Sequence, residues 1–135
     1  MSVFPANAEN IERFANVIGT GEAVAFPTET VYGLGVDARN DEAVAKVFEI
    51  KGRPQFNPLI IHVRDLAQAE TLGVFSALAK LLATAHWPGA LTLVVPRKPI
   101  SNSGSKVSLL ASAGLSSLAL RVPAHPIAQA LLIAT

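Results

Sequence analysis

The sequence predicts one α/β domain in which helices alternate with the strands of a partly parallel sheet. Three observations support this fold class. The 135 residues suffice for one domain with a substantial core and are too few for two. Half of them are apolar and 16% are charged, which excludes a disordered chain. Apolar runs of strand length alternate with segments of helical periodicity.

The amino-terminal half is expected to form two helices and two strands. The expected elements are a helix at residues 7–19, a strand at 22–28, a tight turn at 31–38, a helix at 40–52 and a strand at 58–63. Asn7 can cap the first helix, and Asn40 or Asp41 the second, because their side-chain oxygens accept backbone N–H groups. Gly19 and Gly52 are the residues at which the two helices should end.

The carboxyl-terminal half is expected to continue the alternation. The expected elements are helices at 65–72 and 75–87, a strand at 90–96, a loop or ordered flap at 97–113, a strand at 116–123 and a helix at 125–134. Asp65 is placed to cap the first of these helices, and Pro126 lies in the first turn of the last. The strand at 90–96 is almost continuously apolar, which predicts burial on both faces.

The amino-acid composition excludes several classes of protein. The chain has no cysteine, which excludes disulfides and thiolate chemistry and fits a reducing cytosol. No basic start precedes an apolar stretch at the amino terminus, and the apolar region 107–120 is too short to span a bilayer. We therefore expect a cytoplasmic protein without a membrane partner.

Charge is distributed unevenly along the chain. Residues 1–70 carry six Lys/Arg and ten Asp/Glu, whereas residues 71–135 carry five Lys/Arg and no acid. A segment without carboxylates suits a polyanionic ligand. The alternative is that Arg97, Lys98 and Lys106 only solubilise a linker.

Lys51 and Arg53 flank a glycine where a helix ends and a strand begins. Cations are favoured at a helix carboxyl end by the helix dipole, so both could be structural. However, Pro54 stiffens this turn and Asn57 precedes the strand, so the two cations can be aimed at phosphate oxygens. Spacing alone favours phosphate binding only modestly.

His62 and Arg121 lie inside apolar strands. A lone histidine in a strand is usually a partly buried residue with its hydrogen bonds satisfied. Arg121 is more informative, because an unpaired arginine among apolar neighbours is costly. It needs an internal acid or a ligand carboxylate or phosphate, and few acids face the core, which favours the ligand.

Hydroxyl side chains and glycines follow the strand at 22–28. Thr28, Thr30 and Tyr32 lie at the strand end, and glycines at 33 and 35 let backbone amides approach a ligand. An ordinary turn with solvated threonines is the alternative. The sequence contains neither a Walker A loop nor a dinucleotide-binding fingerprint, and three scattered histidines do not indicate a metal site.

Four blocks of sequence together resemble the YrdC-type threonylcarbamoyl-AMP synthase family. They are FPTETVYGLG, KVFEIKGRPQFNPLIIHV, HWPGALTLVVPRK and LALRVPAHPIAQALL. The resemblance implies a twisted mixed sheet with flanking helices around a concave, positively lined cavity. It also implies an enzyme that condenses L-threonine, bicarbonate or carbon dioxide, and ATP into threonylcarbamoyl-AMP. Pyrophosphate is released, and the product serves threonylcarbamoyladenosine modification of tRNA through downstream transfer proteins.

The resemblance also implies roles for individual residues. Lys51 and Arg53 are implied as catalytic and ATP-binding, with Mg²⁺ accompanying the nucleotide and no metal ligand among the protein side chains. The other implied residues are Asn57 and Ser117 for ATP, and Thr30, Tyr32, His62 and Arg121 for threonine. Ser117 stands where the family usually has threonine.

The sequence departs from the family pattern after its last expected helix. Family members continue past the last helix into a Pro-Ser-Ala-Asn-x-Ser-Gly segment, so residues 1–135 are expected to be a carboxyl-terminally truncated YrdC-like domain with doubtful activity of its own. Two other functions remain open. The chain could be a non-catalytic module for tRNA or double-stranded RNA, or a related domain that makes carbamoyl-adenylate during hydrogenase maturation.

Overall fold

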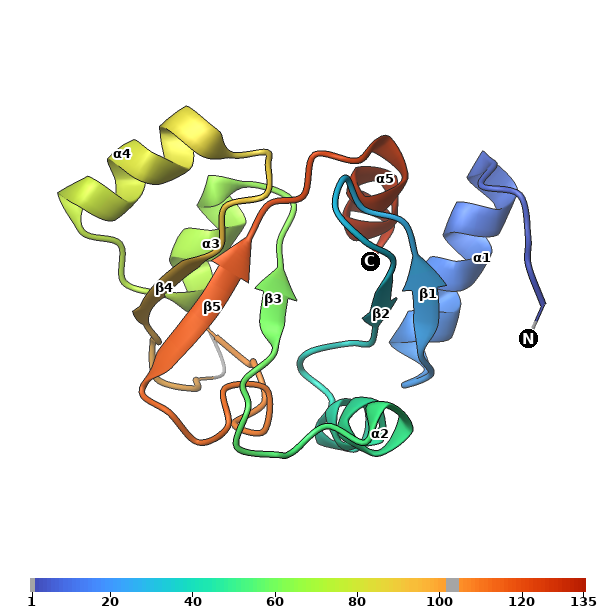
Figure 1. Ribbon diagram of the computed structural model, residues 1–135, viewed down its shortest axis with the longest axis horizontal. Coiled ribbons are helices and arrows are strands. Elements are labelled where there is room, and N and C mark those ends of the chain that lie inside the picture. The colour runs from blue at the N-terminus through green and yellow to red at the C-terminus, as the bar shows by residue number, and fades with distance from the viewer. Residues whose placement is uncertain (1, 102–104) are drawn as a thin grey trace.

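The computed structural model describes residues 2–101 and 105–135 and contains two small sheets that lie side by side (Figure 1). In one sheet, β1 (Val24–Phe26) pairs antiparallel with β2 (Gly33–Gly35). The other has the order β3-β5-β4, in which β3 (Ile60–His62) runs parallel to β5 (Ser117–Arg121) and β4 (Leu93–Pro96) runs antiparallel to it. The expected α/β fold with a partly parallel sheet is confirmed.

Helices flank both sheets. Those in the described residues are α1 (Ala8–Gly19), α2 (Asp41–Lys51), α3 (Leu66–Leu72), α4 (Ala77–His86) and α5 (Pro126–Ala134). In Figure 1, α1 and α5 lie beside the β1-β2 sheet, α3 and α4 accompany the larger sheet, and α2 lies below the β1-β2 sheet. None of the helices in residues 2–101 and 105–135 combines the length and the apolar character needed to cross a bilayer.

The predicted helix ends are confirmed by their capping contacts. The side-chain oxygens of Asn7, Asn40 and Asp65 each accept an N–H three residues ahead, at 2.9, 3.1 and 2.7 Å. Such a cap contributes about 1 kcal/mol. Gly52 ends α2 with a φ of +58°, a left-handed conformation that glycine adopts without a Cβ penalty. Pro126 occupies the first turn of α5, where its missing N–H is not needed.

Two apolar clusters hold the fold together. The larger one joins α2, α3 and the three-stranded sheet, with Leu118 and Leu120 of β5 at 1% and 0% exposure. Burying a leucine side chain to this extent contributes about 2 kcal/mol. The smaller cluster joins Ala15 and Ile18 of α1 to Leu131 of α5. Helix α1 is therefore held mainly by a helix from the other end of the chain.

Residues Gly33–Gly35 form strand β2 instead of the expected tight turn. The chain reverses before them, between Phe26 and Gly33, which are partners in the β1-β2 ladder. The glycines are needed here for close packing, because a Cβ added at Gly35 would lie 2.6 Å from Cε1 of Phe26. The sequence did not reveal this contact, since it depends on a side chain of the neighbouring strand.

Burial of β4 on both faces is also not observed. Val95 is 4% exposed, whereas its neighbour Val94 is 68% exposed. Strand β4 lies at the edge of the sheet and pairs only with β5 among the described strands. An apolar run therefore occurs in a strand with only one buried face.

The segment after β4 is packed against the core and is not a solubilising linker. The guanidinium of Arg97 donates from Nη1 to Oγ of Ser112 and from Nη2 to the carbonyl of Val107, both at 2.6 Å. Lys98 donates from Nζ to the carbonyl of Glu70. The linker interpretation is therefore wrong for Arg97 and Lys98. Residues 102–104 of the expected loop lie outside the described residues.

Candidate functional site

A cavity of about 530 Å³ lies between the two sheets. Its walls come from β1, β2 and their connection, from the end of α2, from β3 and β5, and from α1 and α5. Most of the residues singled out from the sequence line it together: Thr30, Tyr32, Lys51, Arg53, His62 and Arg121. Asn57 and Ser117 are not among its lining residues.

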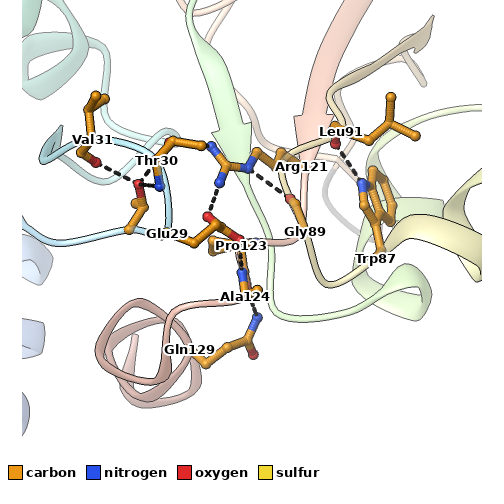
Figure 2. A network of polar contacts seen from close by, with 11 residues as sticks. Glu29, Thr30, Val31, Trp87, Gly89, Leu91, Arg121, Pro123, Ala124 and Gln129 are labelled. Atoms are coloured by element: carbon orange, nitrogen blue, oxygen red, sulfur yellow. Dashed lines mark hydrogen bonds and ion pairs between the residues drawn. The ribbon is translucent and has the colours of Figure 1, made fainter.

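Arg121 lies at the end of β5 in a polar network (Figure 2). Its side chain is 8% exposed and forms an ion pair from Nη2 to Oε1 of Glu29. Nε donates to the carbonyl of Gly89 at 3.0 Å, and Nη1 donates to Oγ1 of Thr30 at 3.3 Å. The preference for a ligand over an internal acid is corrected here, because Glu29 supplies that acid. The signal was present in the TET triplet, where Glu29 adjoins Thr30.

The ion pair leaves part of the guanidinium available. An arginine side chain carries five N–H donors, of which the described contacts use three. One donor remains on each terminal nitrogen of Arg121.

Glu29 links two segments that are far apart in the sequence. Its Oε1 accepts from Arg121, and its Oε2 accepts the backbone N–H of Ala124, just after β5. Within the β1-β2 connection, Thr28 donates from Oγ1 to the carbonyl of Val31 at 2.5 Å. Side-chain contacts therefore hold this connection against the end of β5, as Figure 2 shows.

His62 lies on β3 directly opposite Arg121 in the parallel ladder. Its ring meets the ring of Phe26 on β1 edge to face, with 6.2 Å between the centroids. This contact spans the two sheets. Burial lowers the pKa of His62 below its ordinary value of 6.5, and the opposing hydrogen bond with the backbone of Ile60 does not offset it. Burial therefore favours the neutral imidazole over the charged one.

Lys51 and Arg53 lie at the other end of β3, where α2 ends. Lys51 is exposed at the last turn of the helix. Arg53 donates from Nη2 to the carbonyl of Pro58 at 2.8 Å and from Nε to that of Asn57 at 3.4 Å. Asn57 thus contacts Arg53 through its main chain. In residues 2–101 and 105–135, neither cation has a carboxylate within 4.0 Å.

The cavity is also lined by charged residues that were not singled out from the sequence. Arg39 pairs with Asp37 through two parallel hydrogen bonds, from Nε at 2.9 Å and from Nη2 at 3.0 Å. Burial alone would raise the pKa of Asp37, but the Arg39 hydrogen bonds and charge outweigh it and lower that pKa below 3.8. Arg64 also lines the cavity and lies 3.9 Å from Asp65. Neither pair was singled out from the sequence, although Asp37 and Arg39 lie two residues apart and Arg64 and Asp65 are adjacent.

Across residues 2–101 and 105–135, no three His, Asp or Glu side chains are grouped closely enough to hold a metal ion.

Comparison with known proteins places the chain in a family. The model of the Sua5/YciO/YrdC family, described as telomere recombination, matches residues 16–135. The chain belongs to the Sua5/YciO/YrdC family. This agrees with the resemblance noted in the four sequence blocks.

Two curated relatives that the chain resembles share one name. The threonylcarbamoyl-AMP synthase of Bacillus subtilis is 48% identical over 127 residues, covering 93% of this chain and 35% of the relative. The threonylcarbamoyl-AMP synthase of Pyrococcus abyssi is 46% identical over 119 residues, covering 87% of this chain and 33% of the relative. The chain therefore spans about a third of the length of these relatives.

Solved structures confirm the YrdC-like fold. P. abyssi Sua5 complexed with L-threonine superposes with a TM-score of 0.87 at 43% identity, covering 95% of this chain and 36% of that one. Escherichia coli YciO superposes with a TM-score of 0.83, covering 95% of this chain and 60% of that one. At 24% identity, YciO supports the fold alone.

Proposed function

We propose that the cavity binds L-threonine and ATP, and that residues 1–135 belong to the YrdC-like domain of a threonylcarbamoyl-AMP synthase, without the final segment of that domain. The observation that carries this proposal is the convergence of six side chains from distant sequence blocks on one cavity. The names of the relatives and the L-threonine complex of P. abyssi Sua5 support it.

The phosphate end of the proposed site is formed by Lys51 and Arg53. Neither has an acidic partner among the described residues, so both charges are available to phosphate oxygens. The carbonyls of Asn57 and Pro58 fix the direction of the Arg53 guanidinium. Mg²⁺ belongs to the proposal as an ion bound through the ATP phosphates, which is its usual mode beside nucleotides. Nucleotide contacts of the Asn57 and Ser117 side chains stay predictions.

The threonine end is formed by Arg121 and the residues around it. The two remaining N–H donors of Arg121 suit the threonine carboxylate. Thr30 contacts Arg121 and His62 is its ladder partner, and with Tyr32 they line the cavity and offer hydroxyl groups and an imidazole. Such groups suit the hydroxyl and amine of threonine.

The reaction follows from bringing the two ends together. The threonine amine attacks carbon dioxide, loses a proton and becomes a carbamate. A carbamate oxygen then attacks the α-phosphorus of ATP, and the bond from that phosphorus to the pyrophosphate oxygen breaks. Transfer of this kind depends on alignment and charge neutralisation more than on a dedicated acid or base. Lys51 and Arg53 would stabilise the charge that develops on the departing pyrophosphate.

Pyrophosphate release tests the proposal. The reading frame that encodes residues 1–135 is expressed in full, and pyrophosphate is measured with ATP and bicarbonate, with and without L-threonine. We expect release that depends on L-threonine and that falls by at least about tenfold in Lys51→Ala. Release that is indifferent to L-threonine would reject the proposed activity.

The RNA-binding alternative stays a prediction. Of the cations in the acid-free half, Arg121 is paired with Glu29, whereas Arg97 and Lys98 donate to neutral acceptors and keep their charge. The role of the product in tRNA modification, downstream transfer proteins and a cytoplasmic setting are part of the proposed function and stay predictions.

A further inference from the structure

The cations around the cavity differ in whether an acid neutralises them. The paired ones are Arg39 with Asp37 at 2.9 Å, Arg64 with Asp65 at 3.9 Å and Arg121 with Glu29. Lys51 and Arg53, in contrast, have no acid within 4.0 Å in the described part of the chain. The uncompensated positive charge of the cavity therefore lies where α2 ends.

Strand β3 lies between Arg53 and Arg121. It follows the Pro58 carbonyl that binds Arg53, and it ends at His62, the ladder partner of Arg121. The four extended steps from Pro58 to His62 span about 13 Å. One end of the cavity thus carries two uncompensated cations, and the other carries an arginine whose charge is already balanced.

We propose that Glu29 determines which ligand each end of the cavity accepts. By neutralising Arg121, Glu29 makes that end suitable for a zwitterion such as an amino acid and unattractive to a polyphosphate. The polyphosphate is then directed to Lys51 and Arg53. The identity of the amino acid rests on the proposed function, whereas the division of charge rests on the ion pairs alone.

Glu29 acts through Arg121 and is a positioning residue. It is not among the residues that line the cavity, although Arg121 and Thr30 are. Its second carboxylate oxygen accepts the N–H of Ala124, which fixes the carboxylate beside the guanidinium. Because Arg121 retains a donor on each terminal nitrogen, the ion pair lowers the net charge without occupying the whole binding group.

Glu29→Gln tests the proposal, because it removes the charge and keeps the size and one acceptor oxygen. The matched control is Glu22→Gln, since Glu22 pairs with Lys46 at 3.1 Å and does not line the cavity. Calorimetric titrations with inorganic pyrophosphate and with L-threonine are compared for the wild type and both variants. We expect one pyrophosphate site in the wild type and the control, with less than about a twofold effect of pyrophosphate on L-threonine affinity.

In Glu29→Gln, the Arg121 end carries an uncompensated charge. We expect a second pyrophosphate site there and competition that weakens L-threonine binding by about tenfold. A variant that still binds one pyrophosphate and shows no competition would overturn the proposal. If the wild type binds pyrophosphate but not L-threonine, the proposed function fails, and the number of pyrophosphate sites still decides the role of Glu29.

A measurement on the wild type keeps the proposal testable even if Glu29→Gln does not fold. Backbone amide shifts are followed by NMR during titration with pyrophosphate. We expect the largest shifts at residues 51–53 and little change at residues 29–30 and 121–124. Shifts of equal size at both ends would contradict the charge division.

Discussion

Replacing Arg97 with alanine should loosen the cavity wall at residues 105–116. Arg97 makes two hydrogen bonds of 2.6 Å, to Oγ of Ser112 and to the carbonyl of Val107, a residue that is 2% exposed. A hydrogen bond from a charged donor is worth about 1.5 to 3 kcal/mol, and the buried carbonyl would lose its partner. Because two bonds from one side chain do not add fully, we expect a loss of about 2 to 4 kcal/mol.

Urea denaturation measures the loss in the free energy of unfolding, and hydrogen exchange locates it. In thermal denaturation, about 3 kcal/mol corresponds to a fall in the melting temperature of roughly 10 °C for a chain of this size. Amides of residues 105–116 should exchange faster in Arg97→Ala than in the wild type. Lys106→Ala is the control, because Lys106 is an exposed cation of the same segment and should change stability by less than about 0.5 kcal/mol. Equal stability and equal exchange in Arg97→Ala and the wild type would refute the role of Arg97.

Three further predictions concern the site and its scaffold. Lys51→Ala should weaken ATP binding by about tenfold or more and spare L-threonine, whereas Arg121→Ala should do the reverse; calorimetry showing the same profile for both would contradict the division of roles. Gly73→Ala should cost about 1 to 3 kcal/mol in urea denaturation, because its Cβ would lie 2.5 Å from Cγ2 of Val95, and a neutral result would show that Val95 moves aside. Burial holds the pKa of His62 below 6.5 in the folded state. The stability that the buried neutral imidazole contributes is therefore complete above pH 6.5, the unfolded-state pKa, and it is lost as the pH falls towards the folded-state pKa. His62→Asn should remove this part of the pH dependence of unfolding, and an unchanged pH dependence would show that another group is responsible.

The sequence predicted the helices well because their signals are local. The caps at Asn7, Asn40 and Asp65 each depend on contacts within three residues, and all three are confirmed. The pairing of the strands, and their division into two separate sheets, depend on contacts between segments that are far apart in the sequence. Strand β2 was therefore missed, although its glycines were noticed.

The candidate site shows the same limit. The motif blocks identified which residues would converge, and six of them line one cavity. The partners of those residues were harder to predict. Glu29 was not assigned to Arg121 because the two lie 92 residues apart, and Arg97 was regarded as a possible linker cation because its acceptors lie in a segment without regular structure. Asn57 was assigned by its side chain, whereas the observed contact with Arg53 uses its carbonyl.

The packing of α1 against α5 has a consequence for biosynthesis. The apolar stripe of α1 is completed by Leu131, so the segment up to α5 must be synthesised before Ala15 and Ile18 are fully covered. Contacts between such distant residues slow folding and expose apolar surface in the meantime. Helix α1 is therefore covered late, although it is made before the strands and helices that form the larger apolar cluster.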